Sequence, residues 1–132
     1  MIKFKVIGKP VAKGRPRFAR RGKFVATYTP KKTQQSEDDF KTQSIPHRPA
    51  TPFKKAIRLT VNFSYIKPKS RKKNAYWTTK PDTDNLVKLV KDSMNGIFWM
   101  DDSQVVELIA TKHYGEENYT EVILETLEDE ND

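Results

Sequence analysis

The clearest pattern in the chain is the alternation of apolar and polar residues over 56–66, AIRLTVNFSYI. A period of two residues is typical of a β-strand that buries one face, so we predict a strand here. The segment 2–8 alternates in a similar way and predicts another strand. The segments 99–114 and 119–127 are interpreted as a turn with a strand and as its hairpin partner, joined by the turn sequence GEEN.

Two segments predict helices instead. Over 82–98, apolar residues approximate a 3.6-residue repeat, and Gly96 is placed to end the helix. Over 28–43, Thr29 and Pro30 form a typical helix start, but apolar residues are few. We therefore expect the helix over 28–43 to lie on the surface. Segments broken by proline or glycine separate the elements, and the first of them, 9–24, is predicted to contain a short hairpin around Gly22.

The order β-α-β-α-β-β predicts an α/β (α+β) fold, with a mixed sheet and two main helices packed on it. A length of 132 residues suits one domain, 1–132, and the acidic tail 128–132 is expected to be disordered. The absence of cysteine excludes disulfides and thiolate metal sites. The N-terminal strand is too short to be a signal peptide or a membrane span, so we expect a cytoplasmic protein without a membrane partner.

Charge is distributed very unevenly along the chain. Residues 1–81 contain 22 Lys and Arg and three acids, a net charge of +19, whereas residues 82–132 contain three Lys and 14 acids, a net charge of −11. The basic residues occur in blocks. Such asymmetry indicates a polyanionic partner for the basic half, and nucleic acid is the most common one. The alternative is a solvated surface that is merely basic.

The sequence KPDTDN, residues 80–85, places Asp82 and Asp84 at the expected start of the second helix. Aspartate is a favoured N-cap, and its charge complements the helix dipole. One aspartate fulfils that role and the second is surplus, so the pair is a candidate site for a divalent metal, which prefers oxygen ligands. Lys88, four residues after Asp84, either pairs with it or offers its ammonium to a phosphate.

Asp101 and Asp102 form a second acidic pair, just before a predicted strand. A tight turn explains them equally well, because aspartate is common in turns. A helix of about 14 residues spans about 20 Å, so the sequence alone does not bring Asp102 beside Asp82. Either the loop around 98–102 folds back within one subunit, or a partner subunit brings the acids together.

The segments KPDTDNLVKLVKDSMNG and FWMDDSQV together resemble the RusA family of Holliday-junction resolvases, and GKPVAKGRPRF and TYTPKKT are also similar to members of this family. The resemblance implies a homodimer that binds four-way DNA junctions and nicks two opposed strands with Mg²⁺, or Mn²⁺ as a substitute, and with no organic cofactor. It implies that Asp82, Asp84 and Asp102 hold the metal and that Lys88 is the helix lysine of the catalytic set. Asp101 stays an alternative ligand, because the spacing differs by a residue from some members.

The basic blocks then gain a role as DNA contacts. Phosphate contacts position DNA and make binding depend on salt, without recognising sequence. The residues expected to make them are Lys13, Arg15, Arg17, Arg20, Arg21, Lys23, Lys69, Arg71, Lys72, Lys73 and Lys80. The aromatic residues Phe18, Tyr76 and Trp77 either stack on unpaired bases or pack in the core. Phe98 and Trp99 are expected to pack in the core or in an interface.

These observations predict a metal-dependent, structure-selective endodeoxyribonuclease acting in DNA recombination and repair or, in a prophage, in phage DNA processing. An alternative is a junction-binding module without catalysis, in which the acids are only caps and turns. A second alternative is another carboxylate–Mg²⁺ enzyme acting on nucleotides. The basic blocks and the lack of a glycine-rich phosphate loop argue against that small-substrate alternative.

Overall fold

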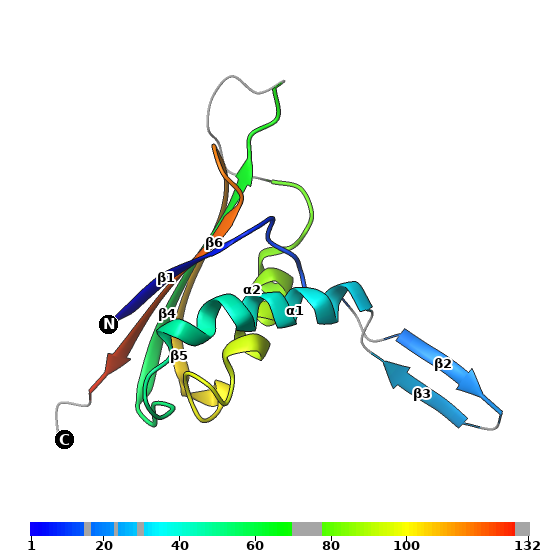
Figure 1. Ribbon diagram of the computed structural model, residues 1–132, viewed down its shortest axis with the longest axis horizontal. Coiled ribbons are helices and arrows are strands. Elements are labelled where there is room, and N and C mark those ends of the chain that lie inside the picture. The colour runs from blue at the N-terminus through cyan, green and yellow to red at the C-terminus, as the bar shows by residue number, and fades with distance from the viewer. Residues whose placement is uncertain (15–16, 23, 29–30, 70–77, 129–132) are drawn as a thin grey trace.

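The computed structural model describes residues 1–14, 17–22, 24–28, 31–69 and 78–128. A four-stranded sheet has the strand order β1 (Ile2–Ile7), β6 (Tyr119–Leu127), β4 (Ala56–Ile66) and β5 (Val105–Gly115). Helices α1 (Lys31–Ser44) and α2 (Thr83–Met94) lie on the same side of this sheet (Figure 1). The short 3₁₀ helices η1 (Ile45–His47) and η2 (Asp102–Gln104) complete this part of the chain. The predicted α+β fold with a mixed sheet is confirmed.

A separate two-stranded hairpin is formed by β2 (Arg17–Arg21) and β3 (Phe24–Tyr28). It projects beyond the N-terminal end of α1, away from the four-stranded sheet (Figure 1). Gly22 has a φ of 61° in the connecting turn, a backbone conformation that glycine adopts at no steric cost. The hairpin predicted around Gly22 is therefore confirmed.

Strand β4 is one of the two inner strands of the sheet and follows the predicted alternation closely. Its apolar positions are buried beneath the helices: Ile57, Leu59, Val61, Phe63 and Tyr65. Its other face carries polar side chains that pair across the sheet, as when Arg58 forms ion pairs with Glu107 and Glu125. The strand thus buries one face and leaves the other polar, as its period of two requires.

Helix α2 connects β4 to β5, and β5 pairs with β4 in parallel. The apolar stripe of α2 is buried against the sheet. Helix α1 contributes one large buried side chain, Phe40. The predicted helix 82–98 is shorter in the structure, ending at Met94 with Gly96 at a φ of 80°. Phe98 and Trp99 follow as fully buried residues of the core, as expected.

The predicted hairpin between 99–114 and 119–127 is wrong, because β4 lies between β5 and β6. The turn at 116–118 crosses over the end of β4 and is bound there. Ser64 Oγ donates to the Glu117 carbonyl at 2.7 Å, and the Ile66 amide donates to Asn118 Oδ1 at 2.8 Å. A Cβ on Gly115 would lie 2.7 Å from Ser64 Oγ, so any larger residue would displace this hydroxyl and disturb its hydrogen bond to Glu117.

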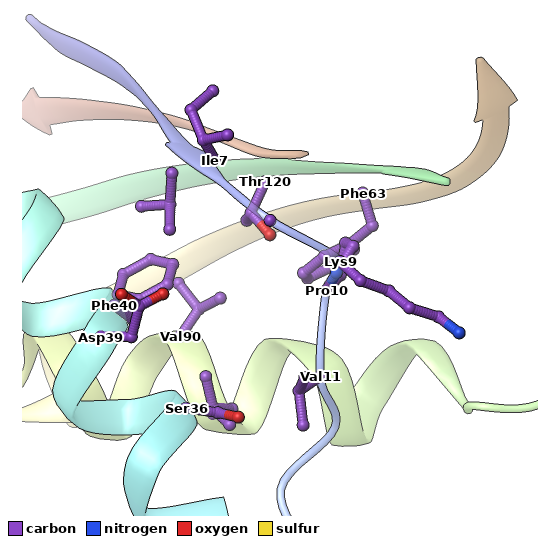
Figure 2. A pocket seen from close by; sticks show the side chains of 13 residues that line it. Ile7, Lys9, Pro10, Val11, Ser36, Asp39, Phe40, Phe63, Val90 and Thr120 are labelled. Carbon is purple, nitrogen blue, oxygen red and sulfur yellow. The ribbon is translucent and has the colours of Figure 1, made fainter. Parts of the chain in front are cut away.

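A small cavity lies where segment 7–11 passes over α1 and α2 (Figure 2). Its volume is about 60 Å³, and its walls combine apolar side chains, including Phe40, Phe63 and Val90, with polar groups. Such a space holds a few water molecules at most. We therefore place the functional site elsewhere. Within the described ranges, no helix is long and apolar enough to cross a membrane.

Candidate active site

Asp82 and Asp84 stand at the entrance of α2, where the loop from β4 returns to the sheet. Asp82 is the N-cap residue by backbone conformation, yet its side chain makes no capping hydrogen bond. Asp84 lies in the first helical turn, and both residues are exposed. In the part of the chain that the structure describes, neither carboxylate has a hydrogen bond or an ion pair. Their oxygens therefore remain available to a ligand, and helix capping does not account for Asp82.

Lys88 lies one helical turn after Asp84 and is exposed. The two charges form no ion pair, although residues four apart on a helix are neighbours. Both border a groove of about 340 Å³ between α2 and β5, which is lined by Asp84, Val87, Lys88, Lys91, Asp92, Asp102 and Leu108. A groove with two lysines between acidic residues suits a phosphate next to a metal ion.

The two acids before β5 have different roles. Asp101 caps η2: it accepts hydrogen bonds from the backbone N–H of Ser103 at 3.0 Å and from its hydroxyl, and Gln104 completes a capping box. These hydrogen bonds from Ser103 lower the pKa of Asp101. Asp102 instead accepts a hydrogen bond from Trp99 Nε1 at 2.9 Å through Oδ1. Asp101 is thus explained by its turn, and Asp102 is the oriented carboxylate that borders the groove.

The connection β4–α2–β5 places the acids at opposite ends of α2. Asp82 and Asp84 precede the helix or begin it, and Asp102 follows it, directly before β5. Asp84 and Asp102 share the groove, but Asp82 is not among its lining residues. Among the described residues of a single chain, no three carboxylate or imidazole side chains are close enough to hold one metal ion. Carboxylate oxygens suit Mg²⁺ well, and one chain brings only part of such a ligand set together.

Lys13, expected to contact DNA, points into the protein instead. Its ammonium pairs with Glu37 of α1 and, at 3.2 Å, with Asp92 of α2, and its side chain is only 18% exposed. Burial alone would lower the pKa of Lys13, but the hydrogen bonds and charges of Glu37 and Asp92 outweigh burial and raise it. We correct the expectation for Lys13: its ammonium joins α1 and α2 through Glu37 and Asp92.

The other expected DNA contacts fall into three groups. Arg17, Arg20 and Arg21 belong to strand β2 of the projecting hairpin. Lys69 and Lys80 are exposed. Outside the described residues lie Arg15, Lys23, Arg71, Lys72, Lys73, Tyr76 and Trp77, together with Thr29 and Pro30 of the expected helix start.

Two side chains that the sequence analysis did not assign to the site form hydrogen bonds to it or next to it. Trp99 was expected to be a core residue, and it also orients Asp102. Lys112 of β5 donates hydrogen bonds to the carbonyls of Thr79 and Pro81, each at 2.8 Å, directly before Asp82. The only signal for Lys112 in the sequence is that it is one of three lysines in the acidic part of the chain.

Comparison with known proteins supports the resemblance noted in the sequence. The family model described as endodeoxyribonuclease RusA matches residues 8–125. The chain is 39% identical over 134 aligned positions to the uncharacterized protein YqaN of Bacillus subtilis (strain 168), covering 93% of this chain and 94% of that protein. It is 38% identical over 90 positions to the crossover junction endodeoxyribonuclease rusA of Lactococcus phage r1t, covering 63% and 66% of the two chains. The chain therefore belongs to the RusA endodeoxyribonuclease family.

Proposed function

We propose that this protein is a Mg²⁺-dependent, structure-selective endodeoxyribonuclease that resolves Holliday junctions by paired nicks. One observation carries the proposal. In a chain of the RusA family, Asp82 and Asp84 lie at the start of α2, and their carboxylates form no hydrogen bond or ion pair with the described residues. The setting is DNA recombination and repair, or the processing of phage DNA. The DNA contacts proposed below and the lack of a membrane-spanning helix among the described residues suit a cytoplasmic protein.

The proposed metal ligands are Asp82, Asp84 and Asp102, and Mn²⁺ substitutes for Mg²⁺. When bound, the metal supplies Lewis-acid activation of water and stabilises charge on the phosphate. Lys88 lies on the groove with its ammonium unpaired among the described residues, so we assign it to the scissile phosphate as negative charge develops there. Water attacks phosphorus and the bond to the 3′ oxygen breaks, which leaves a 5′-phosphate and a 3′-hydroxyl.

The incomplete ligand set in one chain supports a homodimer. Strand β5 is an edge of the sheet, with one side paired to β4 and the other side open within the described sheet. It is 11 residues long and exposes Val106, Leu108 and Ile109 by 60%, 48% and 50%. A long apolar edge of this kind invites pairing with another strand. We assign that position to β5 of a second copy of the chain.

Antiparallel pairing of two β5 strands would also complete the acidic set. Antiparallel partners bring the start of one strand beside the end of the other. Asp102 stands just before the start of β5, whereas Lys112, near its end, binds the segment that leads into Asp82. Asp102 of each copy would therefore approach Asp82 and Asp84 of the other. Two equivalent sites suit two nicks in opposed strands.

The basic segments would bind the arms of the junction. We propose phosphate contacts for Arg17, Arg20 and Arg21 of the projecting hairpin, for Lys69 shortly after β4, and for Lys80 two residues before Asp82. Arg15, Lys23, Arg71, Lys72 and Lys73 belong to the same basic blocks of the sequence. Lys13 is not part of this surface, because two carboxylates already bind its ammonium.

The test is nicking of a synthetic four-way junction and a matched linear duplex in Mg²⁺. We expect junction-selective nicking by the wild type, and junction binding without nicking by Asp84→Asn. The control is Asp38→Asn, which makes the same change at an exposed position of α1 and should nick normally. Binding of the junction without nicking in either Mg²⁺ or Mn²⁺ would instead support a non-catalytic junction-binding module. A preference for linear duplex would exclude a resolvase.

A further inference from the structure

Lys112 lies near the end of β5, in register with Phe63 of β4. In a parallel pair, residues in register point to the same face, so Lys112 starts from the face that the helices cover. Its Nζ donates one hydrogen bond to the carbonyl of Thr79 and one to the carbonyl of Pro81, each at 2.8 Å. The carbonyl carbon of Pro81 is bonded directly to the amide nitrogen of Asp82.

These contacts fix where the chain enters α2. The usual device for that purpose, a side-chain cap by the N-cap residue, is absent at Asp82. A lysine ammonium carries three donors on one compact charge, and charge-assisted hydrogen bonds are stronger than neutral ones. Strand β5 is held by β4 over ten register positions, so it is a firm base for such a contact.

We propose that Lys112 is a positioning residue for the Asp82–Asp84 turn: by binding the two carbonyls before Asp82, it sets where both carboxylates meet the metal. The inference rests on the function proposed above and extends it to a residue outside the acidic set. Lys112 acts through the backbone of residues 79–81 and touches neither the metal nor the scissile phosphate.

Two simpler roles make different predictions. A lysine that only stabilises the fold would lower the unfolding temperature when replaced, without changing the Mg²⁺ concentration needed for half-maximal nicking. A lysine that contacts DNA would change junction affinity and its salt dependence. A positioning residue changes the metal dependence and leaves junction affinity intact, because partners that orient metal ligands influence metal affinity directly.

The test compares the wild type with Lys112→Met, which keeps the length of the side chain and removes its donors. Lys3→Met is the matched control, because Lys3 lies on the open face of the sheet with Glu121. We expect Lys112→Met to raise the half-saturating Mg²⁺ concentration about tenfold, and to weaken Mn²⁺ binding measured by calorimetry by a similar factor. Junction affinity measured in Ca²⁺, and the Lys3→Met variant, should stay within about twofold of the wild type.

An unchanged Mg²⁺ dependence and Mn²⁺ affinity in Lys112→Met would overturn the inference, as would a loss of junction affinity with unchanged metal dependence. If Lys112→Met does not fold, Lys112→Arg carries the test. The planar fork of arginine does not present three donors from one nitrogen, so we expect the half-saturating Mg²⁺ concentration to rise about threefold or more. An unchanged Mg²⁺ concentration overturns the inference.

A wild type that binds Mn²⁺ but nicks no junction contradicts the proposed function alone, and Mn²⁺ affinity then decides the role of Lys112. A wild type that binds no Mn²⁺ removes both.

Discussion

The indole N–H of Trp99 donates a hydrogen bond of 2.9 Å to Oδ1 of Asp102. Trp99 is fully buried, so this donor is fixed by the core and in turn fixes one oxygen of the carboxylate. Hydrogen bonds of this kind orient metal ligands, and their loss typically reduces metal affinity 10- to 100-fold. The side chain of Trp99 thus connects the core of the protein to Asp102 of the proposed metal site.

Replacing Trp99 by Phe keeps an aromatic ring in the core and removes the N–H donor. We expect the half-saturating Mg²⁺ concentration for nicking to rise about tenfold and the free energy of unfolding to fall by about 1 kcal/mol. Phe98→Leu is the control, because it also alters a buried aromatic residue but removes no hydrogen bond. If both variants lose stability and neither changes the Mg²⁺ dependence, Trp99 is only a core residue.

Asp101 and Asp102 are adjacent, and the structure separates their roles. Asp102→Asn should reduce the rate of nicking by about 100-fold or more, because a neutral amide is a poor Mg²⁺ ligand. Asp101→Asn keeps an oxygen that accepts the Ser103 hydrogen bonds, so its rate should stay within about threefold of the wild type. The measurement is the single-turnover rate on a four-way junction. The reverse order of effects would make Asp101 the metal ligand.

Breaking the open edge of β5 should separate the dimer. The double variant Val106→Lys, Ile109→Lys places two charges on exposed apolar positions of that edge, outside the groove. Light scattering should show a dimer for the wild type and a monomer for the variant, and the monomer should lose Mg²⁺-dependent nicking. Ile7→Lys, which alters an exposed residue of the opposite edge strand β1, should remain dimeric. A wild type that is monomeric at micromolar concentration contradicts the proposed assembly.

Lys13 should stabilise the protein in a pH-dependent way. Its ammonium joins Glu37 and Asp92, so Lys13→Met should lower the free energy of unfolding by about 1.5–3 kcal/mol at pH 7. The pKa of Lys13 is raised in the folded state, so this contribution is fully present below the ordinary lysine pKa of 10.5 and is lost as pH rises through the folded value. Urea unfolding at pH 7, 9 and 11 measures the difference between the two proteins. A difference that stays constant up to pH 11 would show that packing, and not charge, accounts for the effect.

The basic segment before Lys80 should contribute to binding without recognising sequence. Replacing Lys72 and Lys73 by Ala should weaken junction binding for every junction sequence and flatten the plot of log affinity against log salt by up to about two units. Lys3 and Lys54, substituted together, are a control of equal charge change. An unchanged slope would exclude these two lysines from the DNA path.

The parts of the fold that depend on local pattern were predictable from the sequence. The strand 56–66 has the predicted bounds, and the amphipathic stripe of α2 faces the core as expected. The placement of β5 and β6 on opposite sides of β4 was not predictable in this way. It consists of the pairing of β4 with both strands, together with hydrogen bonds from Ser64 and Ile66 to the turn at 116–118, between residues about fifty positions apart.

In the candidate site too, residues close together in the sequence were predictable, whereas contacts between distant residues were not. Asp82, Asp84 and Lys88 could be proposed from the sequence because they are close together in it, at the start of one helix. The contact of Lys112 with Pro81 joins a strand to a loop 31 positions earlier, and the internal role of Lys13 requires two helices to meet around it. Charge pattern identifies basic residues, but only the packing shows which of them face inward.

The most direct test of the account is complementation between two inactive variants, Asp84→Asn and Asp102→Asn. Each variant alone should bind the junction without nicking it. In a mixed dimer, Asp102 from the Asp84→Asn chain meets Asp82 and Asp84 from the Asp102→Asn chain, so one intact site forms. We predict that dissociating, mixing and reassociating the two proteins restores nicking of one strand. A mixture as inactive as its components, with mixed dimers shown to have formed, would contradict a metal site shared between two chains.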